Sequence, residues 1–249
     1  MALLECGEMA AKIPWPRVLA EGAVIVGSIL LALFLEKWSA EREARRDVSA
    51  DLVGIEGELE SNLSLLDYDL DLLRRVVAAS GSLVESLDEQ SDAPFVTVSD
   101  TIAAMARILS PTLDLSMGGV EALMASGRLA IVRSPELRRR LAGLSSLVEE
   151  VTEDEDLAQD IGWQQLYPAI APRADFDHGY VIAELTTERI PGLPLQSRSD
   201  VSHPNSSEIR GYLRARRGWY GAAIRDAEKL QVEMLELRTL IRAELEALN

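Results

Sequence analysis

The feature that most constrains this chain is an apolar run close to its N-terminus. Residues Val18 to Leu35 read VLAEGAVIVGSILLALFL and carry one charge, that of Glu21. As a helix, about 18 residues rise about 27 Å, which is close to the ~30 Å hydrocarbon core of a bilayer. Trp15 and Trp38 flank the run, where aromatic rings favour the headgroup layer. The sequence therefore predicts a transmembrane anchor over residues 14–38.

Two alternatives to a retained anchor fit the sequence less well. A cleaved signal peptide needs a basic start and a small-x-small cleavage site. Here Glu5 and Glu8 precede any basic residue, and the run ends in FLEKW. The second alternative is a helix buried in a soluble protein. We expect the anchor to be retained behind an N-terminal tail of residues 1–13.

The basic residues around the run bear on its orientation. The N-terminal flank carries Lys12 and Arg17, and the C-terminal flank carries four basic residues, Lys37, Arg42, Arg45 and Arg46. Because the richer flank tends to stay in the cytoplasm, the count slightly favours a cytoplasmic C-terminal domain. The orientation stays open, since long domains can override this bias. We expect three residues at the membrane interface: Trp15, Arg17 and Trp38.

Two features inside the run indicate association between membrane helices. Small residues share one helix face and let two helices approach closely in lipid: Ala20, Ala23 and Gly27. Glu21 and Ser28 share another face, and a carboxylate inside an apolar run is a candidate functional residue. The alternatives are that the small residues only face lipid, and that Glu21 is an interfacial residue paired with Arg17 one turn earlier.

Beyond the anchor, apolar residues recur at helical spacing in two long stripes. The first contains Val48, Leu52, Ile55, Leu59, Leu63, Leu66, Leu70, Leu73 and Val77; the second contains Leu230, Met234, Leu237, Ile241, Leu245 and Leu248. Such stripes must be buried against other elements. We predict an all-α fold for residues 39–249, in which the transmembrane helix continues into a long stalk helix. The stalk packs in a helical bundle with a long C-terminal helix.

Shorter elements are placed by their boundary residues. Residues 91–98 are expected to be a loop, followed by a short helix from 99 or 100 to about 109. Ser116 can cap the next helix, and Gly127 can end it. Ser134, Pro135 and Glu136 form a strong helix start, and that helix should run to about 166. Residues 171–206 are rich in proline and predicted to be irregular, and no β-hairpin is evident.

The sequence offers little chemistry for catalysis. A net charge of −16 argues against a nucleic-acid partner, which would require a basic surface. No phosphate-binding glycine loop or nucleophile elbow is present. Asp175, Asp177 and His178 form the one local cluster able to hold a divalent ion, and a chance grouping in a loop is favoured. The acids Glu149, Glu150, Glu153, Asp154, Glu155 and Asp156 are interpreted as a solvated helix face. We expect no cofactor, no metal and no catalytic residues.

The segment Val24–Ala32, VIVGSILLA, and the residues Trp38, Glu41 and Arg42 after it resemble the start of a group of uncharacterised bacterial single-pass membrane proteins. The stretch with Glu58, Leu59 and Asn62 and the central GGVEALMASGRLAIVRSPELRRRLA are also similar to theirs. The resemblance implies a bacterial inner-membrane protein with a helical domain, and it carries no activity.

We therefore expect a non-enzymatic, membrane-anchored helical protein that acts through protein–protein contacts. Its expected partners are the lipid bilayer, which holds the anchor, and either further copies of itself or other membrane proteins. One alternative is a subunit of a larger membrane transport or envelope complex. The other is an enzyme with a site in residues 171–206.

Overall fold

The computed structural model describes residues 15–107, 110–172 and 200–248. Contacts divide the chain into two compact units, residues 1–47 and residues 48–249. Helix α1 (Trp15–Glu89) runs through both units without a break, which confirms the long helix that the first apolar stripe predicts. The side chains of residues 15–23 and 25 lie outside the described ones.

In the first unit, the described large apolar side chains of α1 are exposed. The exposed fractions lie between 51% for Leu35 and 68% for Val24. Among the described residues, no helix has a stretch that is both long and apolar enough to cross a membrane. The anchor predicted over residues 14–38 stays a prediction.

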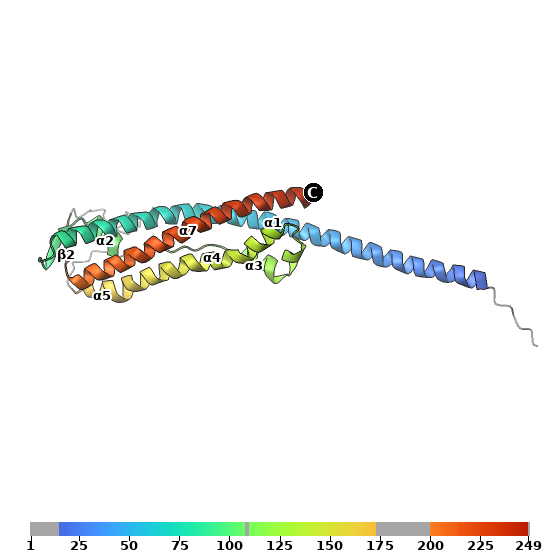
Figure 1. Ribbon diagram of the computed structural model, residues 1–249, viewed down its shortest axis with the longest axis horizontal. Coiled ribbons are helices and arrows are strands. Elements are labelled where there is room, and N and C mark those ends of the chain that lie inside the picture. The colour runs from blue at the N-terminus through green and yellow to red at the C-terminus, as the bar shows by residue number, and fades with distance from the viewer. Residues whose placement is uncertain (1–14, 108–109, 173–199, 249) are drawn as a thin grey trace, which may run out of the picture. The chain divides into compact units, whose positions relative to one another are not determined.

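The second unit is a bundle of three long helices: α1 from residue 48 onward, α4 (Pro135–Asp160) and α7 (Ser207–Leu248) (Figure 1). One apolar cluster joins the stripes of all three helices. It contains Val48, Leu52, Ile55, Leu59, Leu66 and Leu70 of α1, Leu137, Leu141, Leu144 and Val151 of α4, and Leu230, Met234, Leu237 and Ile241 of α7. The predicted packing of the C-terminal helix along the stalk is therefore confirmed.

Polar pairs along the seam between α1 and α7 fix the antiparallel register. From one end of the seam to the other, the pairs are Glu56–Arg242, Glu60–Arg238, Asp67–Gln231, Arg74–Glu228 and Asp88–Arg214. Most of these side chains are well exposed, so each pair adds roughly 1 kcal/mol or less to stability. Together they exclude other registers, since a shift of one turn would misalign every pair.

Helices α1 and α4 both run antiparallel to α7, so they are parallel to each other. Asp88, near the end of α1, pairs with Arg214 near the start of α7, whereas Arg140 near the start of α4 pairs with Glu233 and Glu236 toward the end of α7. The chain must therefore return along the bundle between α1 and α4. It does so through β1 (Phe95–Val98), α2 (Asp100–Arg107), α3 (Gly118–Ala125) and η1 (Arg128–Ile131).

Two short strands differ from the sequence prediction. β1 pairs antiparallel with β2 (Val201–Pro204), with Phe95 opposite Pro204 and Val98 opposite Val201. The interpretation of residues 91–98 as a loop was wrong for residues 95–98, because the partner strand is about 100 residues away in the chain. Asn205, just after β2, donates from its amide to the carbonyls of Leu87 and Gln90 and so caps the end of α1.

The helix that begins at Ser134 extends further than predicted. α4 is followed by the π-helical segment η2 (Ile161–Leu166) and then by α5 (Tyr167–Ile170), so Pro168 does not end the helix. Gly162 in η2 faces the guanidinium of Arg216, and a Cβ at this position would lie 3.1 Å from its Nε. The wider π turn and the missing side chain leave room for this arginine to enter the core.

Packing of α1 against the bundle can be tested with two adjacent leucines. Leu66 is fully buried, whereas Leu65 is 44% exposed. We expect Leu66→Ala to lower the free energy of unfolding by about 2–5 kcal/mol, because it leaves a cavity in the shared core. Leu65→Ala should change it by about 0.5 kcal/mol or less. Urea denaturation of the full chain in mild detergent measures both, and equal losses would contradict this packing.

Candidate functional site

The site residues predicted in the anchor region all fall on α1. The side chains of Trp15, Arg17, Ala20, Glu21 and Ala23 lie outside the described ones. A Cβ on Gly27 would meet no heavy atom within 4 Å. The Ser28 hydroxyl donates to the carbonyl of Val24 at 2.8 Å, and the Trp38 ring lies 5.4 Å from the Arg42 guanidinium carbon. The structure does not test association through these faces.

The most elaborate polar arrangement in the bundle surrounds residues 110–117, which we call the strap. The strap lies between α2 and α3 in the chain, contains neither helix nor strand, and runs along the bundle (Figure 1). Leu113 of the strap joins the core shared by α1, α4 and α7. Side chains from all three long helices hold the strap: Arg216 of α7, Glu155 of α4, and Glu58 and Asn62 of α1.

At its beginning, the strap meets Arg216 of α7. This arginine is fully buried, and it donates from Nη2 to Ser110 Oγ at 3.1 Å and from Nη1 to the carbonyl of Ala106. Its guanidinium also lies 4.9 Å from the ring centre of Tyr220. Burial lowers the pKa of Arg216.

In its middle, the strap meets Glu155 of α4. The Leu113 N–H donates to Glu155 Oε2 at 2.8 Å. Glu155 is 1% exposed, and within the described residues its Oε1 has no hydrogen-bond partner. Burial, with smaller contributions from the negative charges of Asp69 and Asp156, raises the pKa of Glu155 to about 7, although the bond from Leu113 opposes this.

The interpretation of the acids at 149–156 as a solvated face was wrong for Glu155. This residue continues the buried stripe of α4, four residues after Val151 and three before Ala158. The signal was present in the sequence, since Glu155 occupies an apolar position of the heptad-like pattern. Glu149, Glu150, Glu153 and Asp156 are exposed, as expected.

At its end, the strap is held by Asn62 and Glu58, one turn apart on α1. Asn62 donates to the Ser116 carbonyl at 2.6 Å and accepts from the Ser116 N–H at 3.0 Å. Glu58 accepts from the Ser116 hydroxyl at 2.5 Å and from the Gly119 N–H at 3.1 Å. Ser116 was expected to cap α3 itself; the cap comes instead from a carboxylate on another helix, which favours the N-terminal end of the α3 dipole.

The segment after α3 is held by carboxylates as well. Gly127, at φ +74°, ends α3 as predicted. Arg128 then pairs with Asp51 at 3.0 Å. Buried Glu244 of α7 accepts from the backbone N–H groups of Arg133 at 2.6 Å and Ser134 at 3.1 Å.

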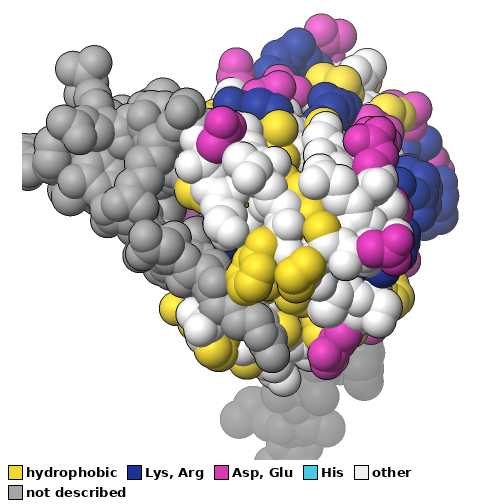
Figure 2. Space-filling model, turned by 90° about the vertical axis from the view of Figure 1, so that its left-hand side faces the viewer, with side chains coloured by type: hydrophobic (Ala, Val, Ile, Leu, Met, Phe, Trp, Pro, Cys, Tyr) yellow, Lys and Arg dark blue, Asp and Glu magenta, His cyan; other side chains and the backbone are white. Residues whose placement is uncertain are grey.

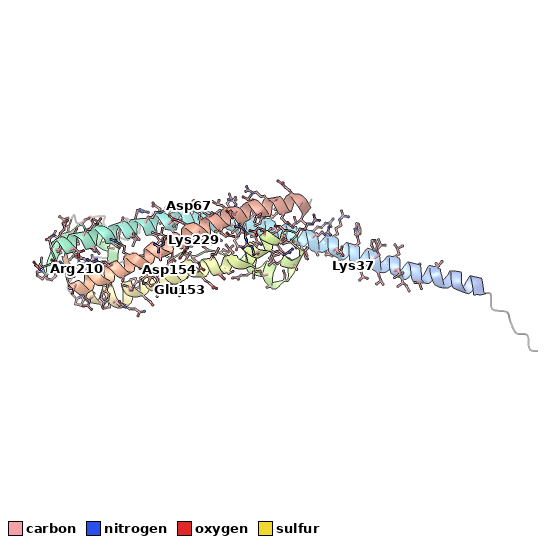
Figure 3. The ribbon with its side chains drawn as sticks, in the orientation of Figure 1. Lys37, Asp67, Glu153, Asp154, Arg210 and Lys229 are labelled. Atoms are coloured by element: carbon pink, nitrogen blue, oxygen red, sulfur yellow. The ribbon has the colours of Figure 1, made fainter. Side chains whose placement is uncertain are left out.

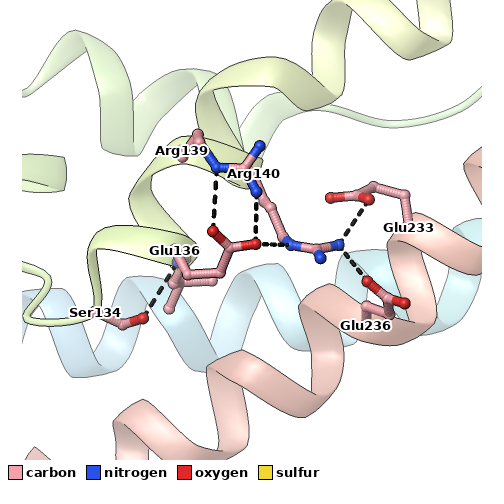
Figure 4. A network of polar contacts seen from close by, with 7 residues as sticks. Ser134, Glu136, Arg139, Arg140, Glu233 and Glu236 are labelled. Atoms are coloured by element: carbon pink, nitrogen blue, oxygen red, sulfur yellow. Dashed lines mark hydrogen bonds and ion pairs between the residues drawn. The ribbon is translucent and has the colours of Figure 1, made fainter.

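The start of α4 is joined to α7 by a second network (Figure 4). Ser134 Oγ accepts from the Leu137 N–H at 3.2 Å, which confirms the predicted cap. Arg140 contacts three carboxylates: Glu136 on its own helix, and Glu233 and Glu236 on α7. These contacts hold Arg140 in its charged form and raise its pKa. The network ties two helices together and leaves no unsatisfied charge on Arg140.

A pair of carboxyl groups lies at the α4–α7 contact. Burial raises the pKa of Asp154, and the charge of Asp226 of α7 and a hydrogen bond with it raise this pKa further. Lys229 Nζ lies 2.5 Å from Asp226 Oδ1, and its positive charge partly offsets the negative charge of the two carboxyl groups. Figure 3 shows Asp154, Lys229 and Asp67 at the same level of the bundle. The neighbouring acids Asp154 and Glu155 therefore face carboxylates on two different helices.

The histidines divide between described and undescribed parts of the chain. Asp175, Asp177 and His178 lie outside the described residues. His203 in β2 is fully buried, and its Nδ1 lies 2.7 Å from the Pro204 carbonyl. Burial and the charge of Arg107 lower the pKa of His203 to about 4, so the ring is neutral near pH 7.

A shallow groove of about 410 Å³ follows one face of α4, lined by Val148, Glu149, Thr152, Glu153, Asp156, Leu157 and Asp160. At the end of the bundle that carries α5 and β2, apolar, acidic and basic side chains are intermixed (Figure 2). Within the described ranges, no group of three acidic, histidine or cysteine side chains is placed to hold a metal ion.

No known protein family matches the chain, and comparisons with curated proteins and with solved structures find no similar protein. The contacts described above position irregular backbone. They hold the strap by hydrogen bonds from three helices.

Substitution of Gly119 tests the contact between Glu58 and the start of α3. A Cβ there would lie 2.8 Å from Glu58 Oε2 and 3.1 Å from Ile55 Cγ1. We expect Gly119→Ala to displace Glu58 and to cost about 1–3 kcal/mol of stability. Gly143→Ala is the matched control, because its Cβ would meet nothing within 4 Å inside α4. It should gain about 0.5–1 kcal/mol. A gain in both variants, measured by urea denaturation, would contradict the close contact.

Proposed function

We propose that this chain is a non-enzymatic protein that is anchored in a bilayer through residues 14–38 and presents a helical bundle for contacts with other proteins. The observation that carries the proposal is the exposure of large apolar side chains on the N-terminal part of α1. Val24, Val26, Ile29, Leu30, Leu31, Leu33, Phe34 and Leu35 are all more than half exposed.

The directions in which these side chains point favour lipid, rather than a partner helix, as the surroundings of this part of α1. At about 100° per residue, they point around most of the helix circumference rather than along one stripe. A partner helix would cover one face only, whereas hydrocarbon surrounds all faces. Trp38 and Arg42, which stack at the polar end of the segment, fit the membrane–water interface.

A bacterial inner-membrane location, with the bundle on the cytoplasmic side, is the further part of this proposal. It follows from the sequence resemblance and from the excess of basic residues after the apolar run. The partners we propose are a second copy of the chain or other membrane proteins. The alternative of a subunit in a larger membrane complex shares the anchor and differs in the partner.

Membrane anchoring is tested by one charge in the apolar segment. We expect Leu31→Arg to reduce the share of the protein that remains in the membrane pellet after alkaline carbonate washing, because arginine at the centre of a spanning helix costs about 2.5–3.5 kcal/mol. Val232→Arg on α7 is the control, since Val232 is 55% exposed and lies in the bundle. The proposal fails if the wild-type chain is washed off, or if both variants behave alike.

Self-association is tested at Gly27. The face formed by Ala20, Ala23 and Gly27 is the proposed contact between two copies. We expect Gly27→Leu to reduce chemical crosslinking between copies in membranes several-fold, because the larger side chain separates the helices. Val26→Leu, on another face, should leave the crosslinking unchanged. Crosslinking that persists in Gly27→Leu would exclude this face.

A further inference from the structure

Glu155 occupies a buried position in the apolar stripe of α4, and it contacts the strap directly. Its Oε2 accepts from the Leu113 N–H, and its side chain is 1% exposed. Within the described residues, Oε1 has no hydrogen-bond partner. A buried carboxylate that lacks one of its hydrogen bonds is costly to ionise. The neutral acid is the form that this environment favours.

We propose that Glu155 is a proton-operated latch of the strap: the neutral side chain lets residues 110–117 close against α1 and α4, and the ionised side chain loosens them. This inference goes beyond the proposed function and does not depend on membrane anchoring.

The charges around Glu155 all act in the same direction. Asp69 faces it from α1, and Asp156 lies next to it on α4; both are negative. On α7, Asp226 acts on Asp154 and pairs with Lys229, while the buried Arg216 donates to Ala106, Ser110 and the Tyr220 hydroxyl. From the strap, the contact is the Leu113 N–H, which favours the ionised form but is outweighed by burial. Ionisation of Glu155 therefore places a negative charge at a buried position that already has two carboxylates as neighbours.

The strap is the element that can yield when Glu155 ionises. The three long helices share a continuous apolar core, so their separation would expose many side chains at once. The strap is neither helix nor strand, and the hydrogen bonds that hold Leu113 and Ser116 come from one side chain of α4, Glu155, and two of α1, Asn62 and Glu58. Lifting Leu113 away would admit water to Glu155 at the cost of one apolar side chain. Segments with few backbone partners are the ones that open locally.

The sign of the pH dependence follows from the direction of the shift. The pKa of Glu155 is raised from an ordinary value of 4.5 to about 7 when the strap is closed. The closed state is therefore favoured most at low pH, and this advantage is lost as the pH rises from about 4.5 to about 7. Above that range the dependence levels off, because Glu155 is then ionised in both states.

Hydrogen exchange of the strap amides tests the latch in the full chain. Exchange of peptides covering residues 110–117 is measured at pH 5 and pH 8 and corrected for the intrinsic rates. We expect the opening constant of the wild-type strap to rise roughly 10- to 100-fold between these values. Glu155→Gln keeps the shape and removes the charge, so its opening constant should change less than twofold. Asp69→Asn should reduce the wild-type rise, because it removes one negative neighbour.

Glu153→Gln is the matched control, since it removes the same charge from an exposed position of α4. It should retain the wild-type dependence. The proposal is overturned if the wild-type strap is equally protected at pH 5 and pH 8, or if Glu155→Gln retains the wild-type rise. If Glu155→Gln does not fold, as judged by circular dichroism, the wild-type and Asp69→Asn measurements decide: an undiminished rise in Asp69→Asn would also overturn it.

Discussion

Burial of one apolar stripe on each of α1, α4 and α7 is the interaction on which the rest of the bundle depends. The buried leucines, isoleucines and valines of the shared core each contribute about 1.5–3 kcal/mol when fully removed from water. The ion pairs along the α1–α7 seam are mostly exposed and add far less, so they select the register rather than supply the stability. The first and last long helices of the bundle are thus joined mainly by apolar contact.

The parallel arrangement of α1 and α4 explains why the strap exists. Two helices that lie parallel require a connection that returns along the full length of the bundle. Between α1 and α4, this connection is not a long helix. The connection is instead partly irregular, so its backbone N–H groups need partners from elsewhere. Glu58, Asn62 and Glu155 provide them from the flanking helices.

The parts of the fold that depend on local patterns could be predicted from the sequence. The stripes of α1 and α7, the Ser134 cap and the glycine that ends α3 all follow from residues close together in the chain. The contacts across long sequence separations could not: Glu58 with Gly119, Glu244 with Arg133, and β1 with β2 each join segments about 60 to 110 residues apart. Glu155 lies between these cases, because its place in the apolar stripe was visible but its neighbours Leu113 and Asp69 were not.

Three carboxylates, those of Glu58, Glu155 and Glu244, accept hydrogen bonds from backbone N–H groups, but they differ in how many bonds they accept. Glu58 and Glu244 each use both oxygens to accept from irregular backbone or a hydroxyl. Glu155 accepts one bond, on Oε2, and is more deeply buried than either. Each hydrogen bond offsets part of the cost of burying a carboxylate, and Glu155 accepts fewer of them than Glu58 or Glu244. An apolar residue at position 155 would suit the stripe better but would leave the Leu113 N–H without a partner. The acid at position 155 therefore provides a hydrogen-bond partner for the strap but places an ionisable group in the apolar core. The bond from the Leu113 N–H favours ionisation of Glu155, whereas burial in the core opposes it.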